Sequence, residues 1–312
     1  MKRSGQRRRT WLRGAAALVL AALAAAPAQA EPQRLPTPVA PQVVPARLHP
    51  ALWKVADADT TIYLFGTVHV MKPGPVWLDG RLAQALDAAD ELVTEIVDPT
   101  GNATQAALMA RATLPKGRNL RAMMGKAQRA TYEATLKRAG LPLDALDGFK
   151  PWYAGVVLAS LPLIQQGLTA KSGAEAMLEA RPAPRPRGHS GLETVEYQLG
   201  LFDSLPVRSQ LAYLNSVVTE YDTIATQIDD LVKAWGDGDA EALARAMNAD
   251  MDDPKLVETL LTGRNRNWAR WIRARLARPG TVFVAVGAGH LAGKGSVQAQ
   301  LARLGVATTR VQ

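Results

Sequence analysis

Short apolar runs near both ends of this chain enclose a long middle stretch with helical spacing. The runs ALWKV and TTIYLFG are rich in β-branched and aromatic residues and flank ADAD, which predicts a hairpin or two adjacent strands. Residues 77–90 have helical spacing, and ELVTEIV then predicts a short strand. Near the C-terminus, TVFVAVG predicts a buried strand, followed by a helix over 293–305 and a closing strand in VATTRV.

The chain between about 101 and 278 is predicted to be mostly helical, with Pro and Gly clusters between the segments. A strand-like break, GHSGLE, interrupts it near 188–193, after a surface loop in ARPAPRPRGH. The predicted helices cover residues 126–139, 151–167, 206–236, 239–250 and 254–277.

The order strand, Gly-x-x-His, helix, strand occurs near the start of the domain and again in the last thirty residues. Each copy is typical of a βαβ unit, in which a right-handed crossover makes the strands parallel. The predicted fold class is therefore α/β: pseudo-duplicated βαβ units forming a mixed, largely parallel sheet, with a large helical insertion.

The first thirty residues have the features of a secretory signal peptide. They carry six basic residues and no acid, then GAAALVLAALAAAPAQA, which ends in an Ala-x-Ala cleavage pattern. Removing those six charges lowers the net charge from +9 to +3, which weakens a nucleic-acid role. Residues 31–50 contain six prolines and predict a linker, so the folded domain is expected over 51–312. The expected location is the periplasm or outside, by Sec export or, because of RRRTWLRG, by the twin-arginine route.

Composition excludes several kinds of site. The chain has no cysteine, so it has no thiol nucleophile, thiolate metal site or disulfide. It also lacks G-x-S-x-G, HExxH and the Walker loop. GAGHLAG resembles a dinucleotide loop, but only twenty residues follow it, too few for the rest of such a fold.

Two of the four histidines follow a glycine by three residues at the end of a predicted strand. The pairs are Gly66 with His69 and Gly287 with His290. Glycine tolerates positive φ and lets a strand turn sharply, so both rings are expected over the carboxyl edge of the sheet, where sites of open α/β sheets form. The alternative is that each is a helix-cap or core histidine.

Two glutamates and a basic pair are further candidates. Glu95 lies in an apolar strand, where a carboxylate needs a metal, an arginine or a histidine unless it faces solvent on an edge. Glu193 follows a glycine at a strand-to-helix junction and could instead complement a helix dipole. In GRNRNWARW, Arg264 and Asn267 are expected on one helix face, which could bind a substrate carboxylate or simply be solvated.

Two imidazoles and a carboxylate without thiolates suit a divalent ion such as Mn²⁺, Co²⁺, Fe²⁺ or Zn²⁺. We therefore expect His69, His290 and Glu95 as metal ligands, a metal that acidifies bound water, and a spare glutamate as general base.

At these residues the chain resembles the TraB/PrgY/GumN family over roughly residues 50–312. The resembling stretches are LWKV, TIYLFGTVHVMKPG, ELVTEIV, SGLETVEYQLGLFDSLP, LVKAWGDGDAEAL, RNRNWA and VFVAVGAGHLAGKGSVQAQLARLG. The resemblance implies a wider group with the Tiki metalloproteases, the erythromycin esterases and a haem-binding lipoprotein family. The matching positions make Glu95, Glu193 and Arg264 the expected catalytic residues, with Glu193 as a second base or as a group that orients its neighbours. Arg264 and Asn265 are also expected to bind substrate.

The sequence therefore predicts an exported, metal-dependent hydrolase, with a peptidase as the first expectation and a peptide or small molecule as substrate. Nucleic acid is not an expected partner, and no membrane span is expected in the mature chain. One alternative is a non-catalytic protein that binds haem, metal or a peptide signal. Another, suggested by the family name alone, is an accessory role in polysaccharide production.

Overall fold

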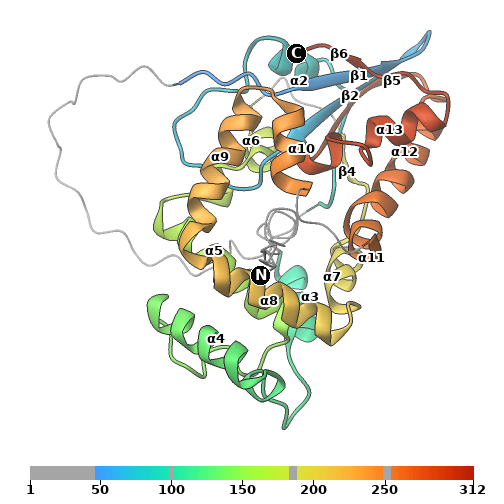
Figure 1. Ribbon diagram of the computed structural model, residues 1–312. Helices are drawn as coiled ribbons and strands as arrows, with labels where there is room; N and C mark the ends of the chain where they lie inside the picture. The colour runs from blue at the N-terminus through green and yellow to red at the C-terminus, as the bar shows by residue number, and fades with distance from the viewer. Residues whose placement is uncertain (1–45, 98–100, 183–187, 249–253) are drawn as a thin grey trace, which may run out of the picture.

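The computed structural model describes residues 46–97, 101–182, 188–248 and 254–312, with a sheet at one end and helices at the other (Figure 1). Three predicted segments lie wholly or partly outside the described residues: the signal peptide, most of the linker over 31–50, and residues 183–187 of the surface loop in ARPAPRPRGH. Residues 46–50, which we assigned to the linker, already run beside the domain. The N–H of Val76 donates to the carbonyl of Ala46 (2.9 Å), and the N–H of Leu48 donates to the carbonyl of Val76 (2.9 Å).

The described strands form one six-stranded sheet in the order β4-β3-β5-β2-β1-β6. The β2–β5, β3–β5 and β3–β4 pairs are parallel, whereas β1 is antiparallel to both β2 and β6. Strand β1 therefore runs against the other strands, and the prediction of a mixed, largely parallel sheet is confirmed. The bounds are β1 Leu52–Ala56, β2 Thr60–Thr67, β3 Glu91–Thr94, β4 Gly188–Gly191, β5 Gly280–Gly287 and β6 Thr309–Arg310.

Each predicted helix range contains at least one observed helix, and most helices are inserted between β3 and β5. The helices over 102–112, 174–179 and 195–203 fall in the predicted helical region but were not predicted individually. The α-helices are α2 Gly80–Asp87, α3 Asn102–Ala112, α4 Lys126–Arg138, α5 Pro151–Gln165, α6 Ala174–Glu179, α7 Val195–Asp203, α8 Val207–Glu220, α9 Ile224–Gly236, α10 Ala240–Asn248, α11 Pro254–Val257, α12 Gly263–Arg275 and α13 Val297–Arg303.

Three predicted helices differ from those observed. The helix over 206–236 is interrupted by a 3-10 turn, where the Thr223 hydroxyl donates to the carbonyl of Glu220 (2.9 Å) and competes with helical pairing. The helix over 254–277 contains a π-turn, and a Cβ at Gly263 would lie 2.6 Å from the Glu258 carbonyl oxygen, so only glycine fits there. The last helix begins only after Ser296, whose side chain caps it.

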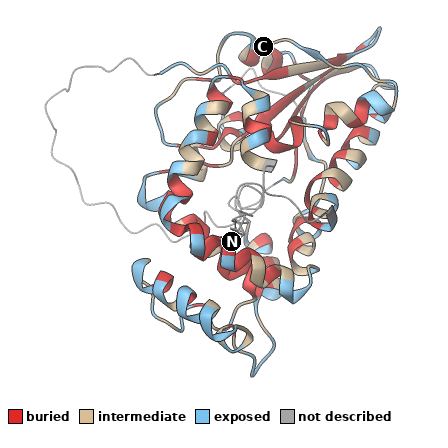
Figure 2. Ribbon diagram, in the orientation of Figure 1, coloured by how far each residue is buried: buried red, intermediate tan, exposed pale blue. Residues whose placement is uncertain are grey.

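Helices cover both faces of the sheet, because successive apolar residues of its central strands point to opposite faces. In β2, Ile62 and Leu64 face α12 and α13, while Phe65 faces the opposite side with α2, α6, α9 and α10. In β5, Val284 and Phe283 divide in the same way. Figure 2 shows these strands as buried, and a separate apolar core joins the helices α3, α4, α5, α7 and α8.

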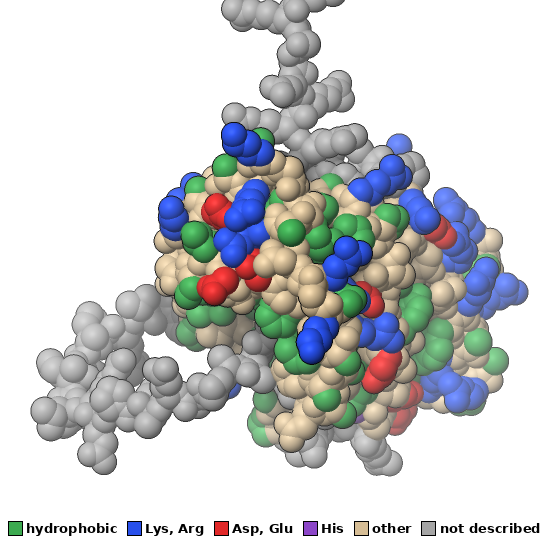
Figure 3. Space-filling view, turned by 90° about the horizontal axis from the view of Figure 1, so that it is seen from below, with side chains coloured by type: hydrophobic (Ala, Val, Ile, Leu, Met, Phe, Trp, Pro, Cys, Tyr) green, Lys and Arg blue, Asp and Glu red, His purple; other side chains and the backbone are tan. Residues whose placement is uncertain are grey.

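The described residues contain no helix long and apolar enough to cross a membrane. On the face seen in Figure 3, lysines and arginines form several separate groups with carboxylates between them, rather than one basic stripe.

The register of the sheet brings the two Gly-x-x-His motifs to the same edge. Thr67 is paired with Gly287 at the ends of β2 and β5, so both histidines emerge at one level. Strand β3 ends at Thr94, so the prediction that Glu95 lies within the strand is wrong by one residue. The Thr94 hydroxyl donates to the carbonyl of Ile96 (2.8 Å) and thereby stabilises the turn in which Glu95 stands.

Candidate functional site

Three side chains converge beside Gly287 at the carboxyl edge of the sheet. A Cβ atom added at Gly287 would lie 3.1 Å from Glu95 Oε1, 3.6 Å from His69 Nε2 and 3.7 Å from His290 Cδ2. The N–H of Gly287 donates to Glu95 Oε1 (2.7 Å). The two predicted histidines and the predicted glutamate therefore surround one point, which we call the Gly287 cradle, and the glycine keeps that point open.

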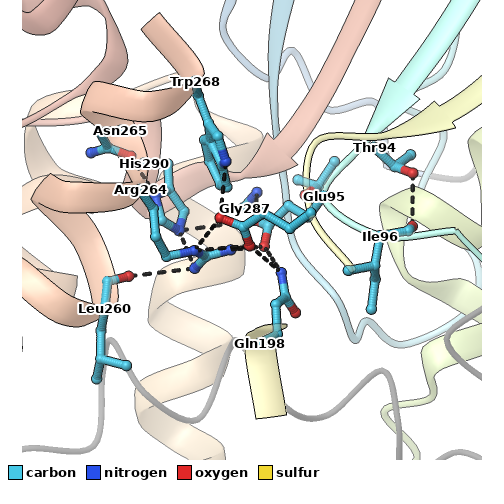
Figure 4. Close-up of polar contacts among 12 residues, drawn as sticks. Thr94, Glu95, Ile96, Gln198, Leu260, Arg264, Asn265, Trp268, Gly287 and His290 are labelled. Carbon is cyan, nitrogen blue, oxygen red and sulfur yellow. Dashed lines mark hydrogen bonds and ion pairs between the residues drawn. The ribbon is translucent and has the colours of Figure 1, made fainter. Parts of the chain in front are cut away.

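Arg264, a fully buried residue of α12, joins the carboxylates of the site (Figure 4). Its Nη2 donates to Glu95 Oε2 (2.6 Å) and to Glu193 Oε2 (2.8 Å), and its Nε donates to Glu193 Oε1 (2.9 Å). Its guanidinium carbon also lies 4.7 Å from the centre of the Trp268 ring, which stabilises the cation further. The guanidinium therefore binds both glutamates at once.

Glu193 has little hydrogen-bonding capacity left. Besides Arg264, it accepts a hydrogen bond from Trp268 Nε1 (3.0 Å) and one from Gln198 Nε2 (3.0 Å), and Gln198 also donates to Glu95 Oε2 (2.9 Å). A carboxylate held by so many donors is suited to orienting its neighbours. The prediction that Glu193 is a second base remains a prediction, and the geometry favours the orienting role that was its alternative.

The hydrogen bonds fix the proton positions of His290. An arginine can only donate, so the Arg264 Nη1 contact of 3.0 Å makes His290 Nε2 the acceptor. His290 Nδ1 then carries the proton and donates to Asn265 Oδ1 (2.5 Å), while Asn265 Nδ2 donates to the carbonyl of Gly295 (2.8 Å). Both polar ends of Asn265 are engaged, so in this structure it positions His290. Substrate binding by Asn265 stays a prediction.

His69 is held from its other side by Glu175, which was not among the predicted site residues. His69 Nδ1 lies 2.7 Å from Glu175 Oε1, and the Thr67 hydroxyl donates to the same oxygen. His69 Nε2 is buried and has no hydrogen-bond partner. Each ring of the site therefore has its Nδ1 against an acceptor and its Nε2 on the side of Glu95.

The two histidines have opposite electrostatic environments. Burial lowers the pKa of His69, but the charge and hydrogen bond of Glu175 outweigh it and raise the pKa to about 9. Burial and the charge of Arg264 lower the pKa of His290 to about 3. His69 therefore favours a positive charge at neutral pH, whereas His290 remains a neutral acceptor.

Glu95 and Glu175 favour the ionised form despite their burial. Burial raises the pKa of Glu95, but Arg264, both histidines and the Gly287 N–H together hold it well below its usual range. Burial likewise raises the pKa of Glu175, which the charge of His69 and the hydrogen bonds of His69 and Thr67 lower. The Glu95 and Glu193 charges raise the pKa of Arg264 against the effect of its burial. The site therefore holds fixed charges of both signs.

The motif glycines act through close approach, and not through the positive φ that we expected. Neither is among the described glycines with positive φ. A Cβ at Gly66 would lie 3.0 Å from Cα of Ala288, the residue after Gly287, so Gly66 lets the two motifs pack together. Trp235 Nε1 also donates to the carbonyl of Gly66 (2.6 Å), which fixes the end of β2.

The remaining candidates divide between the site and the surface. Asn267, expected on the face of Arg264, is exposed; the inward face of α12 instead carries Arg264, Asn265 and Trp268. Trp268 was not among the predicted site residues, although its spacing of four residues from Arg264 predicts a shared helix face. Glu175 and Gln198 were not predicted either. Glu175 lies in a helical segment without any motif, and Gln198 lies within the resembling stretch SGLETVEYQLGLFDSLP, five residues after Glu193.

The residues fit a divalent cation in part. Two atoms that could bind a metal face the cradle. One is His69 Nε2, which has no hydrogen-bond partner, and the other is Glu95 Oε1, which accepts one hydrogen bond from Gly287 and has a second lone pair. The third predicted ligand, His290 Nε2, is occupied by Arg264. As placed, no group of three or more His, Asp or Glu in the described part of the chain could hold a metal. The fit requires Arg264 Nη1 to release His290.

The charge of the site favours a cation. Glu95, Glu193 and Glu175 bring three carboxylates to the site, and Arg264 supplies one guanidinium. Because His69 favours the charged form at neutral pH, one negative charge remains, and a metal that displaced the His69 proton would meet two, the number that a divalent ion neutralises.

Comparison with known proteins identifies the family. The sequence profile of the TraB/PrgY/gumN family matches residues 51–310. The chain belongs to this family. It is 25% identical over 257 residues to the uncharacterized protein YbaP of Escherichia coli strain K12, covering 81% of this chain and 92% of that protein. It is also 25% identical over 244 residues to the uncharacterized protein YbaP of Shigella flexneri, covering 77% and 87% of the two chains. No solved structure matches.

As a member of the TraB/PrgY/gumN family, the chain carries both Gly-x-x-His motifs, the glutamates and the Arg264–Asn265 pair within the matched region. The structure brings all of these residues to the carboxyl edge of the sheet.

Proposed function

We propose that this TraB/PrgY/gumN family protein is an exported, metal-dependent hydrolase that cleaves an amide or ester bond, with a peptide as the first candidate substrate. One observation carries the proposal: the buried, partnerless His69 Nε2 faces Glu95 across the Gly287 cradle, in a site with more carboxylates than cations. A buried imidazole nitrogen without a partner is costly unless a metal, a water or a substrate completes it.

His69 and Glu95 would hold the metal, with His290 as the third ligand once Arg264 has moved. A bound Mn²⁺, Co²⁺, Fe²⁺ or Zn²⁺ would acidify a water molecule and polarise the scissile carbonyl. Both rings already have the support that metal-ligating histidines have, because a carboxylate or an amide oxygen accepts from Nδ1–H.

The chain's own residues supply the rest of the chemistry. Hydrolysis joins the water oxygen to the carbonyl carbon and breaks the bond from that carbon to the leaving nitrogen or oxygen. The proton lost by water passes to a base and then to the leaving group. Arg264 is the group that would stabilise the negative charge developing on the carbonyl oxygen, since its Nη1 is freed when it leaves His290.

Glu95 is better suited to binding than to accepting a proton. Its Oε2 already accepts hydrogen bonds from Arg264 (2.6 Å) and Gln198 (2.9 Å), which stabilise the ionised form. The proton of the attacking water would then pass to a second water molecule or to a basic group of the substrate, and from there to the leaving group.

The proposal is tested by metal analysis of the purified protein together with a peptide-library cleavage assay. The expected result is about one divalent ion per chain and cleavage that a chelator abolishes and added Mn²⁺ or Zn²⁺ restores. If the protein binds no metal and cleaves nothing, but binds haem or a peptide tightly, the proposal is wrong and a binding function takes its place.

A further inference from the structure

We infer that Glu175 is a positioning residue, which holds the His69 ring so that Nε2 faces the Gly287 cradle. The inference deepens the proposed function and rests on it for its chemical meaning. Glu175 lies in α6, within the helical insertion, and no motif marks it. Its Oε1 lies 2.7 Å from His69 Nδ1, and both side chains are largely buried.

The contact has one favourable arrangement. A carboxylate accepts hydrogen bonds and does not donate them, so His69 Nδ1 must carry the hydrogen that lies between the two groups. The Thr67 hydroxyl donates to the same Glu175 oxygen and fixes the carboxylate in turn. With Nδ1 on this side, Nε2 is left on the side of Glu95, where it has no partner within the chain.

The backbone is built to bring Glu175 to this place. The segment before α6 pairs with the segment after β2 through hydrogen bonds in both directions between Met71 and Thr169 (3.3 and 2.9 Å). The N–H of Ala174 donates to the carbonyl of Val68 (2.9 Å). These bonds fix the start of α6 against the first Gly-x-x-His motif.

Gly173 makes this approach possible. A Cβ at Gly173 would lie 2.1 Å from the carbonyl oxygen of His69, which no side chain permits. The chain therefore uses a glycine two residues before Glu175 to bring α6 directly against His69. A glutamate that only capped a helix would need no such contact.

Two substitutions at Glu175 test whether the hydrogen-bond acceptor, and not the negative charge, holds the His69 ring. Alanine leaves His69 Nδ1–H without an acceptor, whereas glutamine keeps an amide oxygen that can accept it. Thr67→Val removes the second hydrogen bond and leaves the carboxylate in place. Glu179→Gln is a matched control on the same helix, because Glu179 also approaches a histidine, His189, at 3.7 Å, outside the cradle.

The experiment has two readouts on the purified protein. Crystal structures of the wild type and the variants report the orientation of the His69 ring, and calorimetry with Mn²⁺ alone reports affinity. We expect the ring to rotate or become disordered in Glu175→Ala, with an affinity about 10- to 100-fold weaker. Glu175→Gln and Thr67→Val should keep the ring and lose less, and Glu179→Gln should match the wild type.

The outcomes separate the inference from the proposed function. A ring that keeps its orientation in Glu175→Ala overturns the inference, whatever the activity. If the wild type binds Mn²⁺, an equal affinity in Glu175→Ala overturns it as well. A ring that moves in a protein whose wild type binds no metal supports the positioning role and contradicts the metal-dependent function. If Glu175→Ala does not fold, glutamine should still rescue the ring orientation, and its failure to do so would contradict the inference.

Discussion

Arg264 and Glu95 are 169 residues apart in the sequence, and Nη2 of the arginine donates to Oε2 of the glutamate over 2.6 Å. The same guanidinium holds Glu193 and contacts His290. The helical half of the chain and the sheet thus meet in one buried ionic network. Stability and chemistry are coupled there, since any change in Arg264 affects both.

Arg264→Ala should destabilise the fold as well as impair the site. It leaves two buried carboxylates without their cation, a change that typically costs about 3–5 kcal/mol. Urea unfolding measures this cost. Arg264→Lys should lose less, because it keeps the charge but not the fork that binds both glutamates.

The matched control is Arg138→Ala, which breaks an exposed pair with Asp222. Its effect should stay within about 1 kcal/mol. Equal stability losses for the two alanine variants would contradict the structural role given to Arg264.

Gly287→Ala should fill the cradle without unfolding the protein. The new methyl would lie 3.1 Å from Glu95 Oε1 and 3.6 Å from His69 Nε2, while Gly287 has φ −49°, which alanine tolerates. We expect metal binding to weaken at least tenfold and the melting temperature to shift by no more than about 4 °C. Gly148→Ala, which meets no atom within 4 Å, is the control. An unchanged metal affinity in Gly287→Ala would mean that the cradle is not the site.

The two site histidines should titrate far apart. His69 should stay charged until the pH nears about 9, and His290 should stay neutral down to about pH 3. NMR of ¹⁵N-labelled histidine can follow both, because the chain has only four histidines. Added metal should displace the His69 proton. Titration of both rings near their ordinary pKa of about 6.5 would contradict this electrostatic account.

The same pKa values predict opposite effects on stability. The raised pKa of His69 gives a contribution that is full below about pH 6.5 and is lost as the pH rises through about 9. The lowered pKa of His290 gives the reverse, because below about pH 6.5 the unfolded chain takes up a proton that the folded ring refuses until about pH 3. His69→Gln should therefore flatten the alkaline limb of a pH–stability profile and leave the acid limb in place.

Export predicts a shortened chain. Mass spectrometry of the protein from its natural compartment should find an N-terminus at or near Glu31, after the Ala28-Gln29-Ala30 pattern. An intact Met1 on protein from the cytosol would contradict the predicted export.

Much of the fold could be predicted because its signals are local. The short continuous apolar runs in TTIYLFG and TVFVAVG mark the central strands, and the glycine-to-histidine spacing marks their ends. The convergence of His69 and His290 followed from the repeated pattern, since the ends of parallel strands share an edge.

Contacts between distant segments could not be predicted in this way. Glu175 reaches His69 only because Gly173 lets α6 approach the end of β2, and no periodicity reveals that approach. Gln198 and Trp268 likewise gain their roles from where α7 and α12 are packed. The i, i+3 spacing predicted that Asn267 shares a face with Arg264, yet the packing of α12 on the sheet turns Asn265 inward and leaves Asn267 exposed.

The most direct test of the central claim is a metal titration of chelator-treated protein that follows binding and hydrolysis together. The account predicts about one Mn²⁺ or Zn²⁺ per wild-type chain, with activity rising in step. His69→Ala and His290→Ala should each lose bound metal, and their hydrolysis should fall by orders of magnitude. If both variants bind metal and hydrolyse substrate as the wild type does, the cradle beside Gly287 is not the site.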